Sequence, residues 1–202
     1  MAANAERRGT MKDIYKGELV RLGAMDAEEA GKAFARWSRD SEFKRLLDSG
    51  VSQLPSSKNA QTWLEKELEE ESGSQYWFSI RKLDDDRLLG DIDLYVHDWR
   101  SRDAFVGLGI GERDLWGKGC GTDVMKVILR YAFTEVNLKR VSLTVFEYNP
   151  RAVRSYEKAG FRHEGRIRRA LNKEGRRWDI LCMGILREEW MEQETQEQGM
   201  QP

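Results

Sequence analysis

Hydrophobic periodicity in the first part of the chain predicts a short strand followed by two helices. Residues 18–22 alternate between apolar and polar side chains, as in a half-buried strand. Asp26 can cap a helix that runs to about residue 38, because it directly precedes an apolar stripe with helical spacing. Asn59 can cap a second helix over 60–71, and the Gly-, Pro- and Ser-containing stretch 48–58 predicts a loop between the two helices.

The next segment is predicted to be rich in strands. Residues 76–81, 88–96 and 104–111 each have strand-like composition. The last run contains three residues that weaken a strand and often mark the close approach of a ligand or another backbone, namely Gly107, Gly109 and Gly111. We expect these glycines either to contact a ligand or to relieve crowding against a neighbouring helix.

The second half of the chain predicts two more helices and three more strands. A Gly-rich turn leads into a helix over 122–136 and an alternating strand over 140–146. Asn149 can cap the next helix, with Pro150 in its first turn, and Gly160 ends it. The last two strands are expected at 161–170 and 177–186. This order of elements predicts an α/β fold with a mixed sheet (α+β).

Length and composition fit one folded domain with short ends. The chain has 202 residues, of which 40% are hydrophobic and 34% are charged, enough for a single core with a highly charged surface. We expect a loose leader over 1–12, one domain over 13–190 and a disordered Glu- and Gln-rich tail over 191–202.

Charge and reactive side chains narrow the classes of function. A net charge of −1 and the lack of an apolar run of ~20 residues predict neither nucleic-acid nor membrane binding, and we expect a cytoplasmic protein. The two cysteines and two histidines are too few and too scattered for a disulfide framework or a metal site. The basic stretch 162–177 is either a solvated face or a docking surface for an acidic partner.

The most informative stretch, Trp116 to Thr122, lies between a predicted strand and a predicted helix. A helix N-terminus has unpaired N–H groups and a partial positive charge, and glycines there let the backbone approach a phosphate. A nucleoside-triphosphate loop does not fit, because Gly111 and Gly117 are one residue too far apart and Gly119 replaces the magnesium-binding hydroxyl. A dinucleotide fingerprint needs its third glycine one position later. The pyrophosphate of coenzyme A is the remaining candidate ligand.

A second motif supports this interpretation. Residues 149–161 read N-x-x-A-x-x-x-Y-x-x-x-G-F. Together, the two motifs resemble the GNAT superfamily of N-acetyltransferases, in the branch of the ribosomal-protein N-terminal (alanine/serine) acetyltransferases and the spermidine acetyltransferases. The family's acetyl-CoA loop reads Q/R-x-x-G-x-G/A, which Gly119 and Gly121 match and from which Trp116 departs. The resemblance covers about 17–190 and implies a twisted, mostly antiparallel sheet flanked by helices.

The resemblance also implies direct transfer, in which a bound amine attacks the thioester of acetyl-CoA. The backbone N–H groups of residues 118, 119, 121 and 122 would hold the pyrophosphate. The strand near 108–111 would pair with the pantetheine amides and offer an N–H to the developing oxyanion. The implied coenzyme-binding residues are Leu108, Ile110, Trp116, Gly117, Lys118, Gly119, Cys120, Gly121, Thr122, Asn149 and Ser155.

Candidate groups for proton transfer follow from side-chain chemistry. We predict Tyr156 as the general acid, because a phenol with a pKa of ~10 can protonate the leaving thiolate. The base is expected to be Glu112 or Asp93, acting through a water molecule, and Asp91 lies on the same strand as Asp93. Cys120 is not expected to be a nucleophile, because no histidine lies near it in the sequence.

The sequence leaves the acceptor amine open. The candidates are a protein N-terminus of the ribosomal-protein type, a polyamine such as spermidine, and an aminoglycoside or other small amine. A polyamine would favour a carboxylate-lined site, for which the glutamates within 65–71 are candidates. A different class is a non-catalytic acetyl-CoA sensor. Dimers are common in this branch, and Trp178 and Trp190 are candidate contacts of a homodimer.

Overall fold

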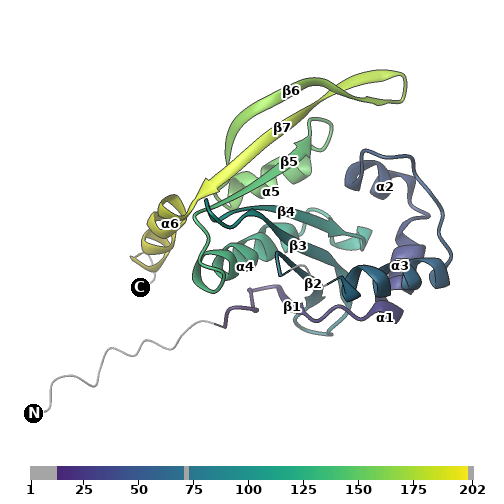
Figure 1. The fold of residues 1–202 in the computed structure, drawn as a ribbon, viewed down its shortest axis with the longest axis horizontal. Helices are drawn as coiled ribbons and strands as arrows, with labels where there is room; N and C mark the ends of the chain where they lie inside the picture. Colours follow the sequence, from purple (N-terminus) through teal and green to yellow (C-terminus); the bar gives the residue numbers. More distant parts are fainter. Residues whose placement is uncertain (1–12, 71–72, 200–202) are drawn as a thin grey trace, which may run out of the picture.

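The computed structural model describes residues 13–70 and 73–199, and the expected leader over 1–12 lies outside the described residues. One seven-stranded sheet runs through the molecule in the order β1-β2-β3-β4-β5-β7-β6 (Figure 1). Its strands are β1 (Val20–Gly23), β2 (Gln75–Lys82), β3 (Leu88–Asp98), β4 (Asp103–Ile110), β5 (Arg140–Phe146), β6 (Arg162–Lys173) and β7 (Arg176–Leu186). All neighbouring pairs are antiparallel except β4 and β5. The predicted fold class is confirmed.

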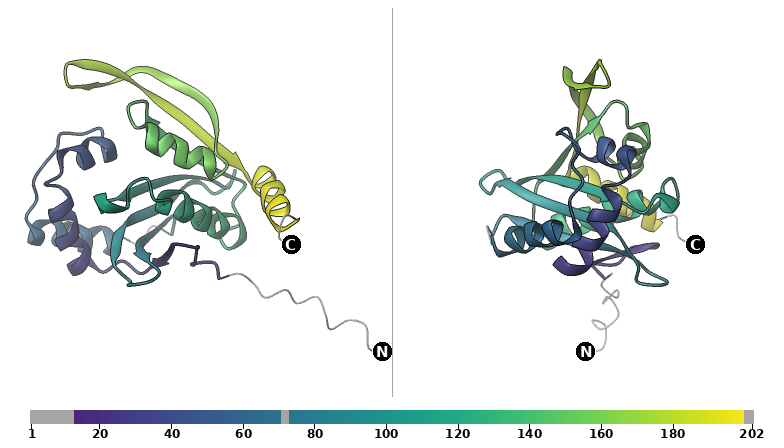
Figure 2. Two further views of the ribbon diagram at one scale, coloured as in Figure 1. Left: turned by 180° about the vertical axis from the view of Figure 1, so that it is seen from behind. Right: turned by 90° about the vertical axis from the view of Figure 1, so that its right-hand side faces the viewer.

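Helices cover both faces of the sheet. They are α1 (Ala27–Trp37), α2 (Ser41–Leu47), α3 (Ser57–Glu69), α4 (Cys120–Thr134), α5 (Pro150–Lys158) and α6 (Arg187–Gly199), with a short 3-10 helix η1 (Arg113–Leu115). Helix α4 buries an apolar face against strands β1 to β5 in the main core. Helices α1 and α3 form a second apolar cluster on the opposite face, where they meet Trp77 of β2. Figure 2 shows α4 and α5 one above the other, away from α1 and α3.

The sheet opens where its only parallel pair is formed. β4 and β5 are paired only from Asp103–Phe105 to Arg140–Ser142. Beyond these three residue pairs the two strands separate, because β4 continues alongside β3 while β5 continues alongside β7. The outer part of β4 therefore has one edge that no strand covers.

Several predicted boundaries are wrong, for physical reasons. The second helix begins at Ser57, because Ser56 and not Asn59 is its cap, and the Ser56 side chain accepts from the Asn59 N–H at 3.1 Å. Helix α2 was not predicted, because a seven-residue helix with one buried side chain, Phe43, has almost no periodicity. Asp26 caps α1 as predicted, accepting from the Glu29 N–H at 2.7 Å.

The expected disordered tail over 191–202 is wrong for most of its length, because α6 continues to Gly199. Glutamate and glutamine are good helix formers, so a polar composition does not exclude a helix. The helix is attached to the body through Trp190, whose ring lies 5.4 Å from that of Phe133, and through the ion pair of Glu189 with Arg162 at 2.6 Å. Trp190 and Trp178, the candidate dimer contacts, thus have ring partners within the chain, Trp178 lying against Tyr148.

Candidate active site

A cavity of about 840 Å³ lies in the gap where β4 and β5 separate. Its walls come from β3, the outer part of β4, the end of β5, the turn before α4, the start of α4, and helices α2 and α5. The predicted site residues that line it are Asp93, Leu108, Ile110, Trp116, Gly117, Gly119, Gly121, Thr122, Asn149, Ser155 and Tyr156. The two sequence motifs, which are about thirty residues apart, therefore meet at one cavity.

The turn before α4 has free backbone donors and space for a diphosphate. The first helical N–H that bonds back along α4 is that of Asp123, to Gly119 O at 3.0 Å, so the N–H groups of 119–122 have no acceptor among the described residues. Gly117 and Gly119 have φ angles of 77° and 92°, which glycine adopts without strain. A Cβ at Gly117 would meet no atom within 4 Å. The turn therefore fits the pyrophosphate of coenzyme A.

The structure corrects one predicted donor in this turn. The Lys118 N–H already donates to Leu115 O at 3.2 Å, and the exposed Lys118 side chain does not line the cavity. Cys120 also does not line it: this residue is buried in the main core, where burial raises the pKa of its thiol. Its thiol is a packing group, and only its backbone belongs to the turn.

Close contact between α4 and α5 completes the phosphate end. Thr122 Oγ1 and Ser155 Oγ lie 3.1 Å apart, and a Cβ at Gly121 would also lie 3.1 Å from Ser155 Oγ. A larger side chain at position 121 would therefore push the two helices apart. Arg151, Arg154 and Lys158 of α5 line the same cavity and supply positive charge.

The uncovered edge of β4 presents backbone groups to the cavity. The Gly111 N–H points toward β3, where it donates to Leu89 O at 2.9 Å. Because strand residues alternate in the direction of their backbone groups, Leu108 and Ile110 direct theirs to the other side. In agreement, Ile110 O accepts from the Trp116 indole N–H at 2.8 Å. The backbone of Leu108 is therefore free to pair with an extended amide chain.

Trp116, the departure from the family's loop pattern, has a structural role at this edge. Its indole ring lies between two guanidinium groups, with Arg113 at 4.7 Å and Arg151 at 3.8 Å from the ring centre. Arg113 also pairs with Asp40 at 2.7 Å, just before α2. Trp116 thus connects β4, the phosphate turn and the α2 region, a network that no local sequence pattern indicates.

Helix α5 contributes the two side chains that the second motif predicted. Asn149 accepts from the Ala152 N–H at 3.2 Å, so it caps α5 while it also lines the cavity. Tyr156 is 8% exposed and lines the cavity from the core side. Burial raises the pKa of the Tyr156 hydroxyl to about 12, so the hydroxyl keeps its proton at neutral pH and can act as a donor.

Two carboxylates of β3, Asp91 and Asp93, also line the cavity. Burial raises the pKa of Asp91 to about 7, even though the Trp77 indole N–H donates to its Oδ2 at 3.0 Å and favours the charged form. Burial also raises the pKa of Asp93. Sequence reasoning proposed Asp93 and only noted Asp91, because nothing in the local pattern shows which of two alternating aspartates lies deeper.

Of the three glycines at positions 107, 109 and 111, the two that lie within β4 make room for these carboxylates. Gly107 pairs with Asp93, and Gly109 with Asp91, so each glycine lies directly across from a carboxylate on the same face. A Cβ at Gly107 would overlap Asp93 Oδ1, and one at Gly109 would lie 3.2 Å from Asp91 Oδ1 and 3.0 Å from Leu47 Cδ1. Glycine at these two positions therefore lets the acidic side chains of β3 lie close to the β4 backbone.

The third glycine and the other candidate base belong to the contact with α1. A Cβ at Gly111 would overlap the Trp37 indole, so this glycine relieves crowding against a helix. Glu112 accepts from the Trp37 indole N–H at 2.9 Å, is ion-paired with Arg36 and lies 3.7 Å from Arg87. The structure therefore places Glu112 outside the cavity, engaged with two arginines, and not where a base is needed.

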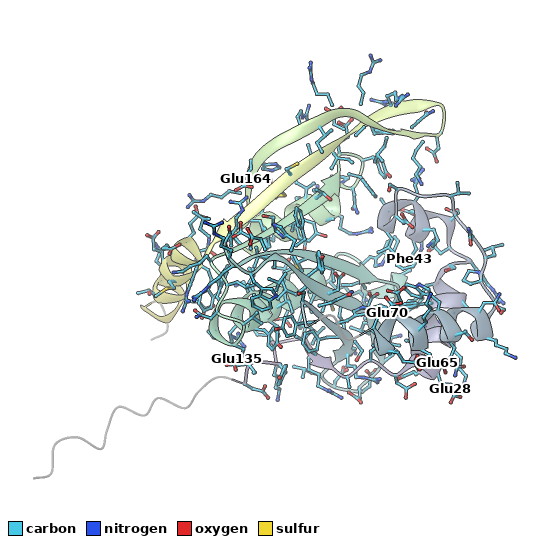
Figure 3. The ribbon with its side chains drawn as sticks, in the orientation of Figure 1. Glu28, Phe43, Glu65, Glu70, Glu135 and Glu164 are labelled. Carbon is cyan, nitrogen blue, oxygen red and sulfur yellow. The ribbon has the colours of Figure 1, made fainter. Side chains whose placement is uncertain are left out.

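Helix α2 closes the acceptor side of the cavity. Phe43, Leu46 and Leu47 line the cavity, and Phe43 lies between α2 and the sheet (Figure 3). The far end of α2 reaches the β6–β7 hairpin, where Arg45 is ion-paired with Glu174 and Lys173 Nζ donates to Gly50 O at 2.8 Å. This end of the cavity is thus bounded by β3, β4 and α2.

The predicted acidic helix does not take part. The α3 glutamates are exposed, and Glu65 lies at the periphery of the molecule (Figure 3). The cavity is lined by no described residue of α3. Its acidic lining among the described residues is therefore limited to the β3 pair.

Comparisons with known proteins show the family to which the chain belongs. Residues 20–162 match the family model described as the acetyltransferase (GNAT) domain. YokL of Bacillus subtilis (strain 168), a SPbeta prophage-derived uncharacterized N-acetyltransferase, is 30% identical over 176 residues, which are 87% of this chain and 94% of YokL. Another protein of that bacterium, named "Putative ribosomal N-acetyltransferase YdaF", is 32% identical over 108 residues, 54% of this chain and 58% of YdaF.

A solved structure shows the same fold. The spermidine N-acetyltransferase from Vibrio cholerae, in complex with CoA and spermine, matches with a TM-score of 0.72 at 22% identity, over 85% of this chain and 98% of that chain.

The chain belongs to the GNAT acetyltransferase family. It is an acyltransferase that uses acetyl-CoA and acts on an amine, as the two motifs predicted. Among the described helices, none is long and apolar enough to cross a bilayer. In the same part of the chain, no three His, Cys, Asp or Glu side chains gather as a metal site would require.

Proposed function

We propose that the protein acetylates the N-terminal α-amine of another protein. The observation that carries the proposal is the layout of the acceptor side, which has one anionic centre at Asp91 and Asp93. Next to it on the same face are the rings of Tyr95 and Phe105, which pair across β3 and β4 and are 47% and 43% exposed. A peptide N-terminus has this pattern, one ammonium followed by an uncharged chain. A polyamine, with several spaced charges, favours further carboxylates.

The name of the relative YdaF, a ribosomal N-acetyltransferase, supports the same substrate class. The spermidine acetyltransferase from Vibrio cholerae supports the alternative, a polyamine, and small cationic amines such as aminoglycosides form a third class. The exposed position of the α3 glutamates removes the feature that most favoured polyamines in the sequence.

In this proposal the residues divide into a donor set and an acceptor set. The N–H groups of residues 119–122 bind the pyrophosphate, with the helix dipole of α4 and the cations of α5 as complementary charge. Acetyl-CoA supplies the activated acetyl group as its thioester. The Leu108 backbone orients the pantetheine arm, and Tyr156 donates a proton to the sulfur as it leaves.

The test is an acceptor panel. Purified protein is incubated with acetyl-CoA and peptides that begin with Ser, Ala or Met, spermidine, spermine or aminoglycosides, and release of the free CoA thiol is followed. We expect turnover on the peptides, with acetylation at the α-amine located by mass spectrometry. Preference for spermidine or an aminoglycoside contradicts the proposal, and acetyl-CoA binding without turnover on any amine favours a sensor.

The same assay tests the acid. Tyr156→Phe is expected to lower kcat by roughly 10²–10⁴-fold, the usual contribution of a positioned acid, because the thiolate then leaves without a proton donor. The dissociation constant for acetyl-CoA, measured by calorimetry, is expected to stay within about threefold of the wild-type value. Unchanged kcat contradicts the role of Tyr156.

A further inference from the structure

We propose that Asp91 and Asp93 form the binding site for the acceptor ammonium group, with Asp91 as the general base and Asp93 as the carboxylate that holds the amine. This inference rests on the proposed transfer to an amine and names the residues that receive it. It assigns a catalytic function to Asp91, and it explains why β4 has glycine at two positions inside a strand.

The geometry separates this pair from the other carboxylates of the chain. Glu112, which is also near the cavity, is engaged by Arg36 and Arg87. Among the described residues, no Lys or Arg lies within ion-pair distance of Asp91 or Asp93, and the Trp77 indole is the only side chain found to donate to Asp91. The two carboxylates on one face of β3 therefore carry negative charge that no neighbouring cation compensates, and an ammonium group would complement this charge.

The two β4 glycines complete the site. Because Gly107 and Gly109 lie directly across from the two aspartates, the carboxylates extend over a strand surface that has no side chains of its own. The amine can therefore reach the carboxylates over the same strand whose Leu108 backbone lines the gap where the donor arm is expected. The proposed acid and the proposed base come from different elements of the cavity wall, because Tyr156 lies on α5 and the two aspartates lie on β3.

The surroundings of Asp91 support its role as the base. The neighbouring elements present Trp77 from β2, Gly109 from β4 and Leu47 from α2, none of which titrates. Within the described part of the chain, Asp93 is the only charged group that acts on it, and its negative charge raises the pKa of Asp91 further. A base with a pKa of about 7 matches the operating pH of a cellular enzyme.

The reaction then balances as follows. Asp91 takes one proton from the ammonium, and the nitrogen lone pair forms a C–N bond to the thioester carbonyl carbon. As the C–S bond breaks, its electron pair leaves on sulfur, which takes the Tyr156 proton. The second proton lost by nitrogen reprotonates Tyr156, and Asp91 releases its proton to solvent. Ammonium and thioester thus give amide, thiol and one proton.

The first experiment compares three isosteric variants, Asp91→Asn, Asp93→Asn and the control Glu65→Gln on the exposed face of α3. Each variant is assayed with the amine that the wild type turns over fastest. If that amine is not a peptide, the proposed substrate is contradicted, but the roles of Asp91 and Asp93 are still tested. We expect Asp91→Asn to lower kcat by roughly 10²–10³-fold, Asp93→Asn mainly to raise the amine KM, and the control to do neither. Calorimetry should give wild-type acetyl-CoA affinity for all three. Wild-type kcat in Asp91→Asn overturns the proposal.

The second experiment is the pH dependence of wild-type kcat/KM, which reports the ionisations of the free enzyme and the free amine, with two amines whose own pKa values differ. Because free α-amines titrate near 7.7–8.0, a limb caused by the substrate moves with the amine, whereas a limb caused by Asp91 stays near pH 7. We expect the fixed limb in the wild type and its loss in Asp91→Asn. A limb that moves with the substrate, with none fixed near pH 7, overturns the assignment of Asp91 as the base.

Discussion

Because Asp91 is buried, its carboxyl group gains and loses its proton near neutral pH. Keeping the charged form buried lowers the free energy of unfolding. Its folded pKa of about 7 lies above the ordinary value for an aspartate of about 3.9. Between these two pH values the folded state binds the proton more tightly, so the free energy of unfolding falls as the pH rises. The residue that we assign as the base is therefore expected to destabilise the enzyme at the pH where it works.

This gives a stability prediction. Asp91→Asn should stabilise the unliganded protein at pH 8, by at most about 4 kcal/mol, because a neutral amide removes the buried charge while still accepting from Trp77. Urea denaturation at pH 4.5 and pH 8 checks it. The difference in unfolding free energy between variant and wild type should be larger at pH 8, and a difference that does not depend on pH would contradict a raised Asp91 pKa.

Gly107 leads to a separate prediction. In Gly107→Ala the new methyl group would overlap Asp93 Oδ1, so the carboxylate must turn away and the amine KM should rise about tenfold or more, as expected when about 1.4 kcal/mol of binding is lost. The control is Gly165→Ala, where a Cβ meets nothing within 4 Å. Steady-state kinetics on both variants decide. An unchanged KM in Gly107→Ala would show that Asp93 does not hold the amine.

Among single residues, the sequence predicted the roles that depend on neighbours in the chain and missed those that depend on residues brought together by folding. Asn149 and Tyr156 could be placed because they lie on one helix within one motif. The choice between Glu112 and Asp93 could not be made, because it depends on Arg36 and Arg87, which lie far away along the chain. Charge pairing of this kind leaves no periodic signal.

At the scale of elements, Asp123 joins β1 to the phosphate turn. Its carboxylate in the first turn of α4 accepts the N–H groups of Glu18 at 3.0 Å, Leu19 at 2.8 Å and Val20 at 3.0 Å. A Cβ at Gly17 would overlap this carboxylate. The start of the sheet is therefore held by the helix that binds the cofactor, across a hundred residues of sequence, which is why no local pattern indicates it.

We expect Asp123→Ala to lower the free energy of unfolding by about 2–4 kcal/mol, because three N–H groups lose a charged acceptor. Glu135→Ala, at the exposed end of the same helix, is the matched control and should change stability by no more than about 0.5 kcal/mol. Urea denaturation of both variants measures the effect. Equal stabilities would show that solvent replaces the Asp123 carboxylate without cost.

At the scale of the whole molecule, α2 connects the two halves of the open sheet. Arg113 pairs with Asp40 on the β4 side, and Arg45 pairs with Glu174 on the β6–β7 hairpin. In Figure 1 this helix lies beneath the tip of the hairpin. Exposed ion pairs stabilise a fold only slightly, so their main effect here is on the position of α2 over the acceptor site.

Arg45→Ala should therefore change global stability by less than about 1 kcal/mol, while it speeds amide hydrogen exchange in α2 and raises the amine KM. The acetyl-CoA affinity should not change, because the phosphate turn makes no contact with Arg45 among the residues that the structure describes. Exchange measured by mass spectrometry checks the first effect. Protection of α2 equal to that of the wild type would show that the hairpin contact does not position it.

The separation of β4 from β5 has a consequence for how such an enzyme can change. The proposed acceptor groups all come from residues 41–109, whereas the proposed phosphate-binding and acid groups come from residues 117–158. Apart from the Leu108 backbone, which is proposed to orient the pantetheine arm, the groups that recognise the two substrates thus come from two successive stretches of the chain. Substitutions or insertions in the first stretch can alter which amine is taken while the donor machinery is inherited unchanged. New acceptor preferences are therefore accessible by short mutational paths.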